Sequence, residues 1–320
     1  MRISEEQTQV SNAGGATPPD ARSPTPRLFP WWAGLLVGIA AGVVGLLPWM
    51  VSGMRLPLQN LWTTDTMPDR MPVALLPLSQ YAVTAILALL AIGPAAAGIV
   101  VRATRRRWTE PSLWALVAGA LLVQLIATVQ AVVVVYGGLQ VRLESALYSV
   151  ALALVALVGI LFGAVELVLI SRAPRAGVLI AFVLAAPLAA QWLALLIAPH
   201  SSGILVGGAA ADATRWLPAL LVGAAIAWCG IGTIGRIVAG LVSLLLLWIL
   251  PVLITAVTAA VGTRVLARQP DEMIAYAATV FRAATVSGES IPPVILCLVV
   301  AVLGLVLRQP IARLVSGRRG

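Results

Sequence analysis

The sequence predicts an all-α protein, a polytopic transmembrane bundle of about eight helices, and three observations support this fold class. The chain has 320 residues, of which 60% are hydrophobic and 10% are charged, and its mean hydropathy is +1.00. Soluble domains contain about 25% charged residues, so this chain cannot form an ordinary water-facing surface. Its hydrophobic residues also occur in blocks of the roughly 20 residues that a membrane-spanning helix requires. A multi-pass membrane protein is therefore the expected class.

The two ends of the chain differ from the rest. Residues 1–30 are polar and rich in Pro and Gly, without hydrophobic periodicity, and are expected to form a disordered cytoplasmic tail. Acidic residues near the start argue against a cleaved signal peptide, so the first hydrophobic block is expected to be an uncleaved anchor. Residues 308–320 are expected to form a short basic cytoplasmic tail.

Eight hydrophobic blocks make up the predicted bundle of residues 31–307, and each is treated as one span. The predicted spans are 31–51, 75–101, 113–136, 146–170, 178–198, 217–234, 237–261 and 293–307. Only Gly235 and Arg236 separate the sixth block from the seventh. Seven spans are therefore the alternative count, with one of these two blocks forming a re-entrant element.

The arginine distribution predicts the orientation of the bundle. All 21 basic residues are arginine, and eight spans with a cytoplasmic N-terminus place 14 of them inside and 7 outside. Short positively charged segments beside span ends favour the cytoplasmic side, and residues 102–107 form the densest such segment. Both termini are therefore expected in the cytoplasm. The lysine-free, alanine-rich composition is typical of a GC-rich bacterial genome, so the inner (plasma) membrane is the expected location.

Three external loops follow from this orientation, at residues 52–74, 199–216 and 262–292. The last loop contains Pro270, Asp271 and Glu272, which are favoured at the start of a helix. A short amphipathic helix is expected after them, lying on the outer membrane surface or covering the bundle. Its apolar face comprises Met273, Ile274, Ala277, Val280, Phe281 and Ala284.

Composition and motifs exclude several functions. The formal charge of +9 does not indicate a nucleic-acid partner, because the arginines flank hydrophobic blocks, where they contact lipid headgroups. A chain without lysine has no P-loop ATPase motif, and Gly230-x-Gly232-x-x-Gly235 lies in a hydrophobic block, outside the strand–helix context of a dinucleotide site. The lone His200 and two isolated cysteines predict no metal site. No catalytic residue, cofactor or metal is therefore expected.

Small residues mark two helix faces that are expected to pack closely. Gly34, Gly38 and Gly42 fall on one face of the first span, and Gly159 and Gly163 on one face of the fourth. Such faces allow two helices to approach closely in lipid. The stripe in the first span is consistent with a homodimer face, but packing against another span of the same chain is the favoured interpretation.

Polar residues within the spans are the candidate functional residues. Four glutamines are expected to act as hydrogen-bonding contacts between helices, and these are Gln80, Gln124, Gln130 and Gln191. Glu166 is the exception, because an ionisable residue at membrane depth is a functional candidate by default. It shares a face with Gly163 and Gly159, which directs it into the bundle. Arg102 and Arg236 are its expected ion-pair partners, and Ser243 is a candidate hydrogen-bond donor.

These features favour a transporter-like or permease-like protein without its own ATPase domain, with an unidentified substrate. Prolines within the spans, at positions 48, 94, 187 and 251, kink helices and weakly support this interpretation. The alternative is a non-catalytic membrane scaffold or accessory protein of cell-envelope assembly. Such a protein would bind a membrane-protein partner or form a homo-oligomer in the lipid bilayer.

Reporter fusions test the predicted topology. Fusions after Arg107, Arg175 and Gly320 should report a cytoplasmic position, and fusions near Asp65 and Asp212 an external one. An external signal from a fusion at Arg236 would contradict the count of eight, because the sixth and seventh blocks would then not both cross the membrane.

Overall fold

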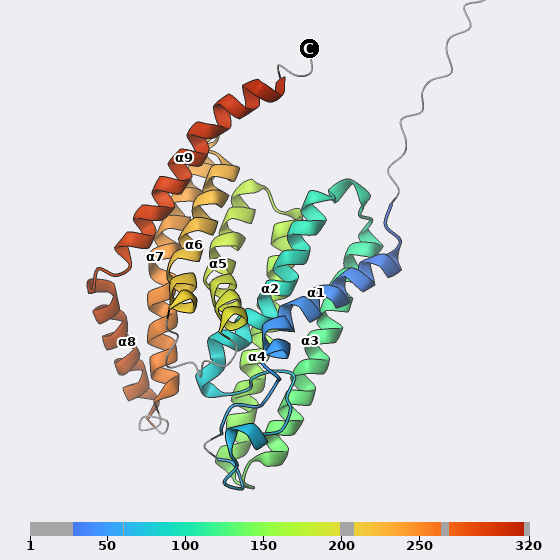
Figure 1. The fold of residues 1–320 in the computed structure, drawn as a ribbon, viewed down its shortest axis with the longest axis vertical. Coiled ribbons are helices and arrows are strands. Elements are labelled where there is room, and N and C mark those ends of the chain that lie inside the picture. Colours follow the sequence, from blue (N-terminus) through green and yellow to red (C-terminus); the bar gives the residue numbers. More distant parts are fainter. Residues whose placement is uncertain (1–27, 60, 199–207, 264–268, 317–320) are drawn as a thin grey trace, which may run out of the picture.

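The computed structural model is all-helical and describes residues 28–59, 61–198, 208–263 and 269–316 (Figure 1). The expected N-terminal tail lies almost wholly outside these residues, as do His200 and the last four residues. Three 3₁₀ turns occur, at Pro68–Arg70, Gln80–Ala82 and Arg105–Arg107. The α-helices of the described part are α1 (Trp31–Val51), α2 (Val83–Ala103), α3 (Glu110–Gly138), α4 (Leu143–Arg172), α5 (Arg175–Ile197), α6 (Ala209–Cys229), α7 (Ile234–Gly262), α8 (Pro270–Val286) and α9 (Ile291–Ser316).

Six helical segments of the described chain are long and apolar enough to cross a membrane. They are α1, the segment Gln80–Ala103 that contains α2, α3, α4, α5 and α7. The pair α8 and α9 meets the same criteria as one broken unit with a 57° bend, which gives up to seven. The protein is thus a multi-pass membrane protein. The predicted block 217–234 accounts for the difference from eight, because α6 starts earlier and carries Asp212 and Arg215 in its first two turns.

The helices form two groups that meet at α5. In the first group, α1 packs against α2 and α3, and α2 packs against α4. In the second group, α6 lies between α5 and α9, and α7 packs against α5 and α8. Figure 1 shows the first group in blue to green and the second in yellow to red, with α5 between them. Contacts of α5 with α2 and α4 join the two groups.

The glycine stripe of α1 lies against α3 of the same chain. A Cβ atom at Gly34 would overlap the Ser112 carbonyl, and one at Gly38 would overlap the Leu116 carbonyl. The contact is reciprocal, because a Cβ atom at Gly119 of α3 would overlap the Leu35 carbonyl. These glycines therefore bring the α1 and α3 backbones into direct contact, as the favoured interpretation of the stripe requires.

An ordered cap, residues 52–79 apart from residue 60, covers one end of the first group. Its apolar side chains are almost fully buried against α1 to α4 and include Leu56, Met71, Leu76 and Leu78. Gln130 of α3 holds the cap with both amide atoms: Oε1 accepts from the Leu75 N–H at 2.8 Å, and Nε2 donates to the Val73 carbonyl at 3.1 Å. The cap is thus anchored to the bundle by its backbone as well as its side chains.

The cap corrects the predicted start of the second span. Block 75–101 begins eight residues before α2, because residues 75–79 belong to the cap. Pro77 disfavours a helix there, and the Ser79 hydroxyl caps the following turn by accepting from the Tyr81 N–H. Gln80 consequently lies in the turn before α2 instead of deep in a span.

Helix α8 occupies the predicted position of the amphipathic helix and packs along α7 (Figure 1). Five residues of its predicted apolar face are half-buried, but Ile274 is 70% exposed. The helix turns into α9 at residues 287–290, where Gly288 has a φ of +72°. Because α8 packs along α7, it agrees better with the predicted arrangement in which this helix covers the bundle than with the one in which it lies on the outer membrane surface.

A pair of glycine substitutions tests the close packing of α1 on α3. Gly38→Ala places a methyl group against the Leu116 backbone carbonyl, which cannot move away as a side chain could. We expect a loss of several degrees in the detergent melting temperature, or roughly 1–3 kcal/mol. Gly240→Ala is the matched control, because it lies in α7 with open space around it. It should leave stability unchanged or slightly higher, since Ala favours a helix. Equal losses would contradict the packing.

Candidate functional site

The candidate site is centred on a break in the hydrogen-bond ladder of α2. Pro94 has no N–H group, so the Leu90 carbonyl one turn earlier lacks its helical donor. The Gln124 side chain of α3 supplies the missing donor through Nε2. Gln124 is 1% exposed, so this bond is shielded from solvent. An α3 side chain thus completes the backbone of α2.

Helix α4 reaches the same carbonyl from its own glycine face. A Cβ atom at Gly163 would lie 2.7 Å from the Leu90 oxygen and 3.2 Å from the Pro94 ring. Gly159, one turn away, packs on the Leu90 and Leu87 side chains. Because glycine has no side chain, the α4 backbone can approach the opened turn of α2. Helices α2, α3 and α4 therefore converge on one peptide carbonyl.

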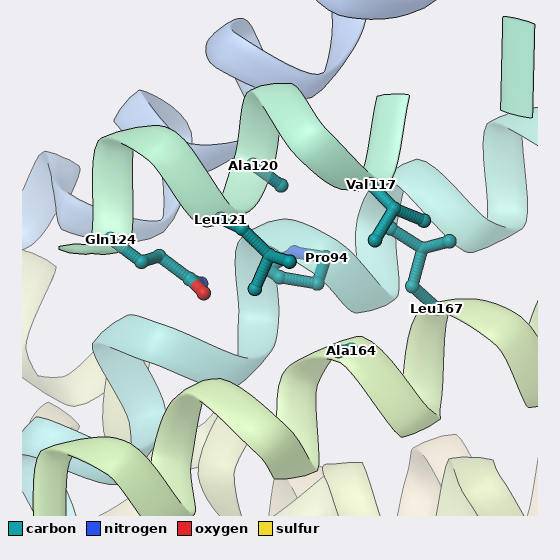
Figure 2. A pocket seen from close by; sticks show the side chains of 7 residues that line it. All are labelled: Pro94, Val117, Ala120, Leu121, Gln124, Ala164 and Leu167. Carbon is teal, nitrogen blue, oxygen red and sulfur yellow. The ribbon is translucent and has the colours of Figure 1, made fainter. Parts of the chain in front are cut away.

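A small cavity lies beside Pro94, between the same three helices (Figure 2). It has room for about one water molecule. Gln124 Oε1 is buried and accepts no hydrogen bond from the described residues. The cavity wall thus carries an open acceptor. Its lining residues are Pro94, Val117, Ala120, Leu121, Gln124, Ala164 and Leu167.

Glu166 is buried in the interface of α4 with α2. Its neighbours on the same face are Gly163, which contacts Leu90 and Pro94, and Ile170, which contacts Gly98. Glu166 is 1% exposed, and neither carboxyl oxygen has a hydrogen-bond partner in the described part of the chain. An isolated carboxylate is costly in such surroundings. The group therefore needs a proton, a cation or a donor that the described residues do not provide.

The two expected ion-pair partners of Glu166 make other contacts or lie at the helix surface. Arg102 donates through Nη1 to the Ile170 and Ala173 carbonyls, at 2.9 Å each. These carbonyls lie at the end of α4, where the helix offers no further donors, so they attract a cationic side chain. Arg236 is half-exposed in the first turn of α7. The structure does not pair Glu166 with either arginine.

The remaining polar candidates either make hydrogen bonds within the fold or lie outside this site. The Ser243 hydroxyl donates to the Ala239 carbonyl of its own helix at 2.7 Å and not to Glu166. Gln130 of α3 holds the cap, and Gln80 lies at the junction of the cap with α2. Gln191 is half-buried on α5, and its side chain has no hydrogen bond within the described residues. The structure therefore places Gln124 at the Leu90 carbonyl, and Glu166 one turn along α4 from Gly163, the residue that packs on the Leu90–Pro94 turn.

Sequence reasoning missed the Leu90 carbonyl, because a backbone atom is not a residue type that a motif search selects. A proline within a span marks the carbonyl four residues earlier, so the signal was present. The buried hydroxyls of Thr128 and Ser145 were also missed, and neither has a hydrogen-bond partner in the described structure. Within the same residues, no group of three metal-binding side chains occurs.

Comparison of the chain with protein-family models, with curated proteins and with solved structures gave no match. The functional argument therefore depends on the chemistry of the site.

A double-mutant cycle tests the link between Gln124 and Pro94. Gln124→Leu leaves the buried Leu90 carbonyl without a donor and should cost about 1–3 kcal/mol of stability in detergent. Pro94→Ala restores an N–H group to α2, so Gln124→Leu should cost much less in that background, with a coupling of about 1 kcal/mol. Gln191→Leu is the control and should cost little. Equal costs of Gln124→Leu in both backgrounds would show that the carbonyl does not depend on Gln124.

Proposed function

We propose that this multi-pass membrane protein is a transporter-like or permease-like protein in which Glu166 takes up and releases a proton. The observation that carries the proposal is the burial of Glu166, one turn along α4 from Gly163, with no hydrogen-bond partner among the described residues. A carboxyl group kept for stability alone would be expected to have a donor or an arginine beside it. Ionisable groups that face a bundle interior commonly serve proton relays or substrate pathways.

The broken helix supports the same proposal. Transporters commonly use interrupted helices, because freed backbone carbonyls can coordinate ions or hydrogen-bond to a substrate. Here Pro94 frees the Leu90 carbonyl, and Gln124 can hold that carbonyl or release it. Gln124, whose Oε1 has no hydrogen-bond partner among the described residues, lines a cavity with room for about one water. A water or substrate group bound there would lie beside Pro94, between α2, α3 and α4.

The finer topology is part of this proposal. We infer eight crossings, by α1 to α7 and by the α8–α9 pair, with both termini in the cytoplasm. Helix α6 supports the count, because its 21 residues extend about 31 Å, the thickness of a bilayer core. The connections α2–α3, α4–α5 and α6–α7 lie at one end of the bundle (Figure 1), and each contains arginines or has them in the adjoining helix turns: Arg105 to Arg107, Arg172 with Arg175, and Arg236. This distribution of arginines supports placing that end of the bundle on the cytoplasmic side of the plasma membrane.

Proton flux into proteoliposomes tests the proposal. The full chain is reconstituted with a pH-sensitive dye inside, and an inward proton gradient is imposed. External amino acids, sugars and carboxylates are added as a mixture or omitted. We expect acidification faster than in empty liposomes under at least one condition. Glu166→Gln should abolish this difference, because it keeps the shape and removes the titratable group.

Glu144→Gln is the matched control, because Glu144 is an exposed residue in the first turn of the same helix. Its flux should equal that of the wild type. Flux that persists in Glu166→Gln, together with a melting temperature lowered by several degrees, would contradict the proposal. It would assign Glu166 a structural role and favour the scaffold alternative.

A further inference from the structure

We infer a second site, independent of the proposed transport function, in which Arg102, Arg105 and Arg175 bind a phosphate group at the arginine-rich end of the bundle. Its base is the Trp228 ring, near the end of α6. The Arg102 guanidinium carbon lies 5.4 Å from the centre of this ring, and that of Arg175 lies 5.8 Å from it. One aromatic ring thus positions two cations from α2 and α5.

A third cation completes the cluster. Arg105 follows Arg102 by three residues, in the 3₁₀ turn after α2, and its side chain is exposed at the same end of the bundle. Like charges repel one another, so an anion bound among these arginines would be favoured. The described residues do not supply one, since their ion pair joins Arg172 to Glu110 instead. The three arginines are therefore a concentration of positive charge without a protein counter-ion.

Donor geometry favours an oxyanion as the missing partner. Arg102 uses only Nη1 to cap α4, which leaves its Nη2 and Nε donors without partners in the described structure. The side chains of Arg105 and Arg175 make no hydrogen bonds to described residues and are exposed. Helix α5 begins at Arg175, so its first N–H groups open toward the same end. A phosphate group accepts several such charge-assisted bonds at once.

The position of the site selects the source of the phosphate. It lies where helices α2, α4, α5 and α6 end or begin, beside long apolar helix surfaces. Arginine and tryptophan are both favoured at the headgroup level of a bilayer. Basic pockets between helix ends bind anionic headgroups. The phosphate of an anionic phospholipid is therefore the expected ligand, and inorganic phosphate is the soluble ligand of the same chemistry.

Two matched double variants test this site. Arg105→Gln with Arg175→Gln removes two cluster charges and leaves the Arg102 cap of α4 intact. Arg106→Gln with Arg107→Gln removes two exposed charges from the same 3₁₀ turn. Phosphatidylglycerol and phosphatidylcholine binding to the detergent-purified full chain is measured by native mass spectrometry. Inorganic phosphate binding is measured by calorimetry, and melting temperatures without ligand verify folding.

The Arg105/Arg175 variant should lose about tenfold or more in phosphatidylglycerol affinity, because each arginine near a headgroup contributes about 1 kcal/mol. The Arg106/Arg107 variant should change it less than about threefold. Phosphatidylcholine should bind weakly to every form. The same selective loss for inorganic phosphate alone would support the site and identify a soluble ligand. Equal losses in both variants, or no loss for any ligand, would overturn the inference.

Discussion

The first helix group depends on one requirement, that every backbone carbonyl inside a bilayer has a hydrogen-bond donor. Lipid cannot provide one, so a proline in a span must be compensated by a neighbouring helix. In this protein Pro94 opens the Leu90 carbonyl, and Gln124 of α3 closes it. This bond joins α3 to α2, while Gly163 and Gly159 allow the close approach of α4. Glu166 lies one turn along α4 from Gly163, so helical periodicity directs it into the interface of α4 with α2.

The two ends of the bundle differ in their chemistry. At one end, a folded cap covers the first helix group, and Gln59 of the cap and Gln130 of α3 hydrogen-bond to backbone groups of the cap. Tyr148 donates to Gln59 Oε1 at 2.7 Å, so the cap is also joined to α4. At the other end, the Arg102 and Arg175 guanidinium groups lie over the Trp228 ring, and Arg102 also donates to the last carbonyls of α4. A closed, neutral end and an open, positive end are consistent with the orientation that the arginine counts predict.

Much of the fold was predictable, because its signals are local. Block length predicted most of the helices, and Gly34, Gly38 and Gly42 predicted a close helix contact. Other features depend on distant partners and were not predictable. The cap forms because Gln130 and Tyr148 reach residues more than fifty positions away, so 75–79 read as part of a span. For Arg102, Glu166 was the partner expected from the sequence, but the side chain donates instead to the Ile170 and Ala173 carbonyls at the end of α4.

The central claim is that Glu166 exchanges a proton within the α2–α4 interface, and infrared difference spectroscopy after a pH jump tests it most directly. The claim predicts a carbonyl-stretch band of a protonated carboxylic acid in the wild type. This band should shift in D₂O, persist in Glu144→Gln and disappear in Glu166→Gln. A spectrum in which Glu166→Gln leaves every carboxyl band unchanged would contradict the account.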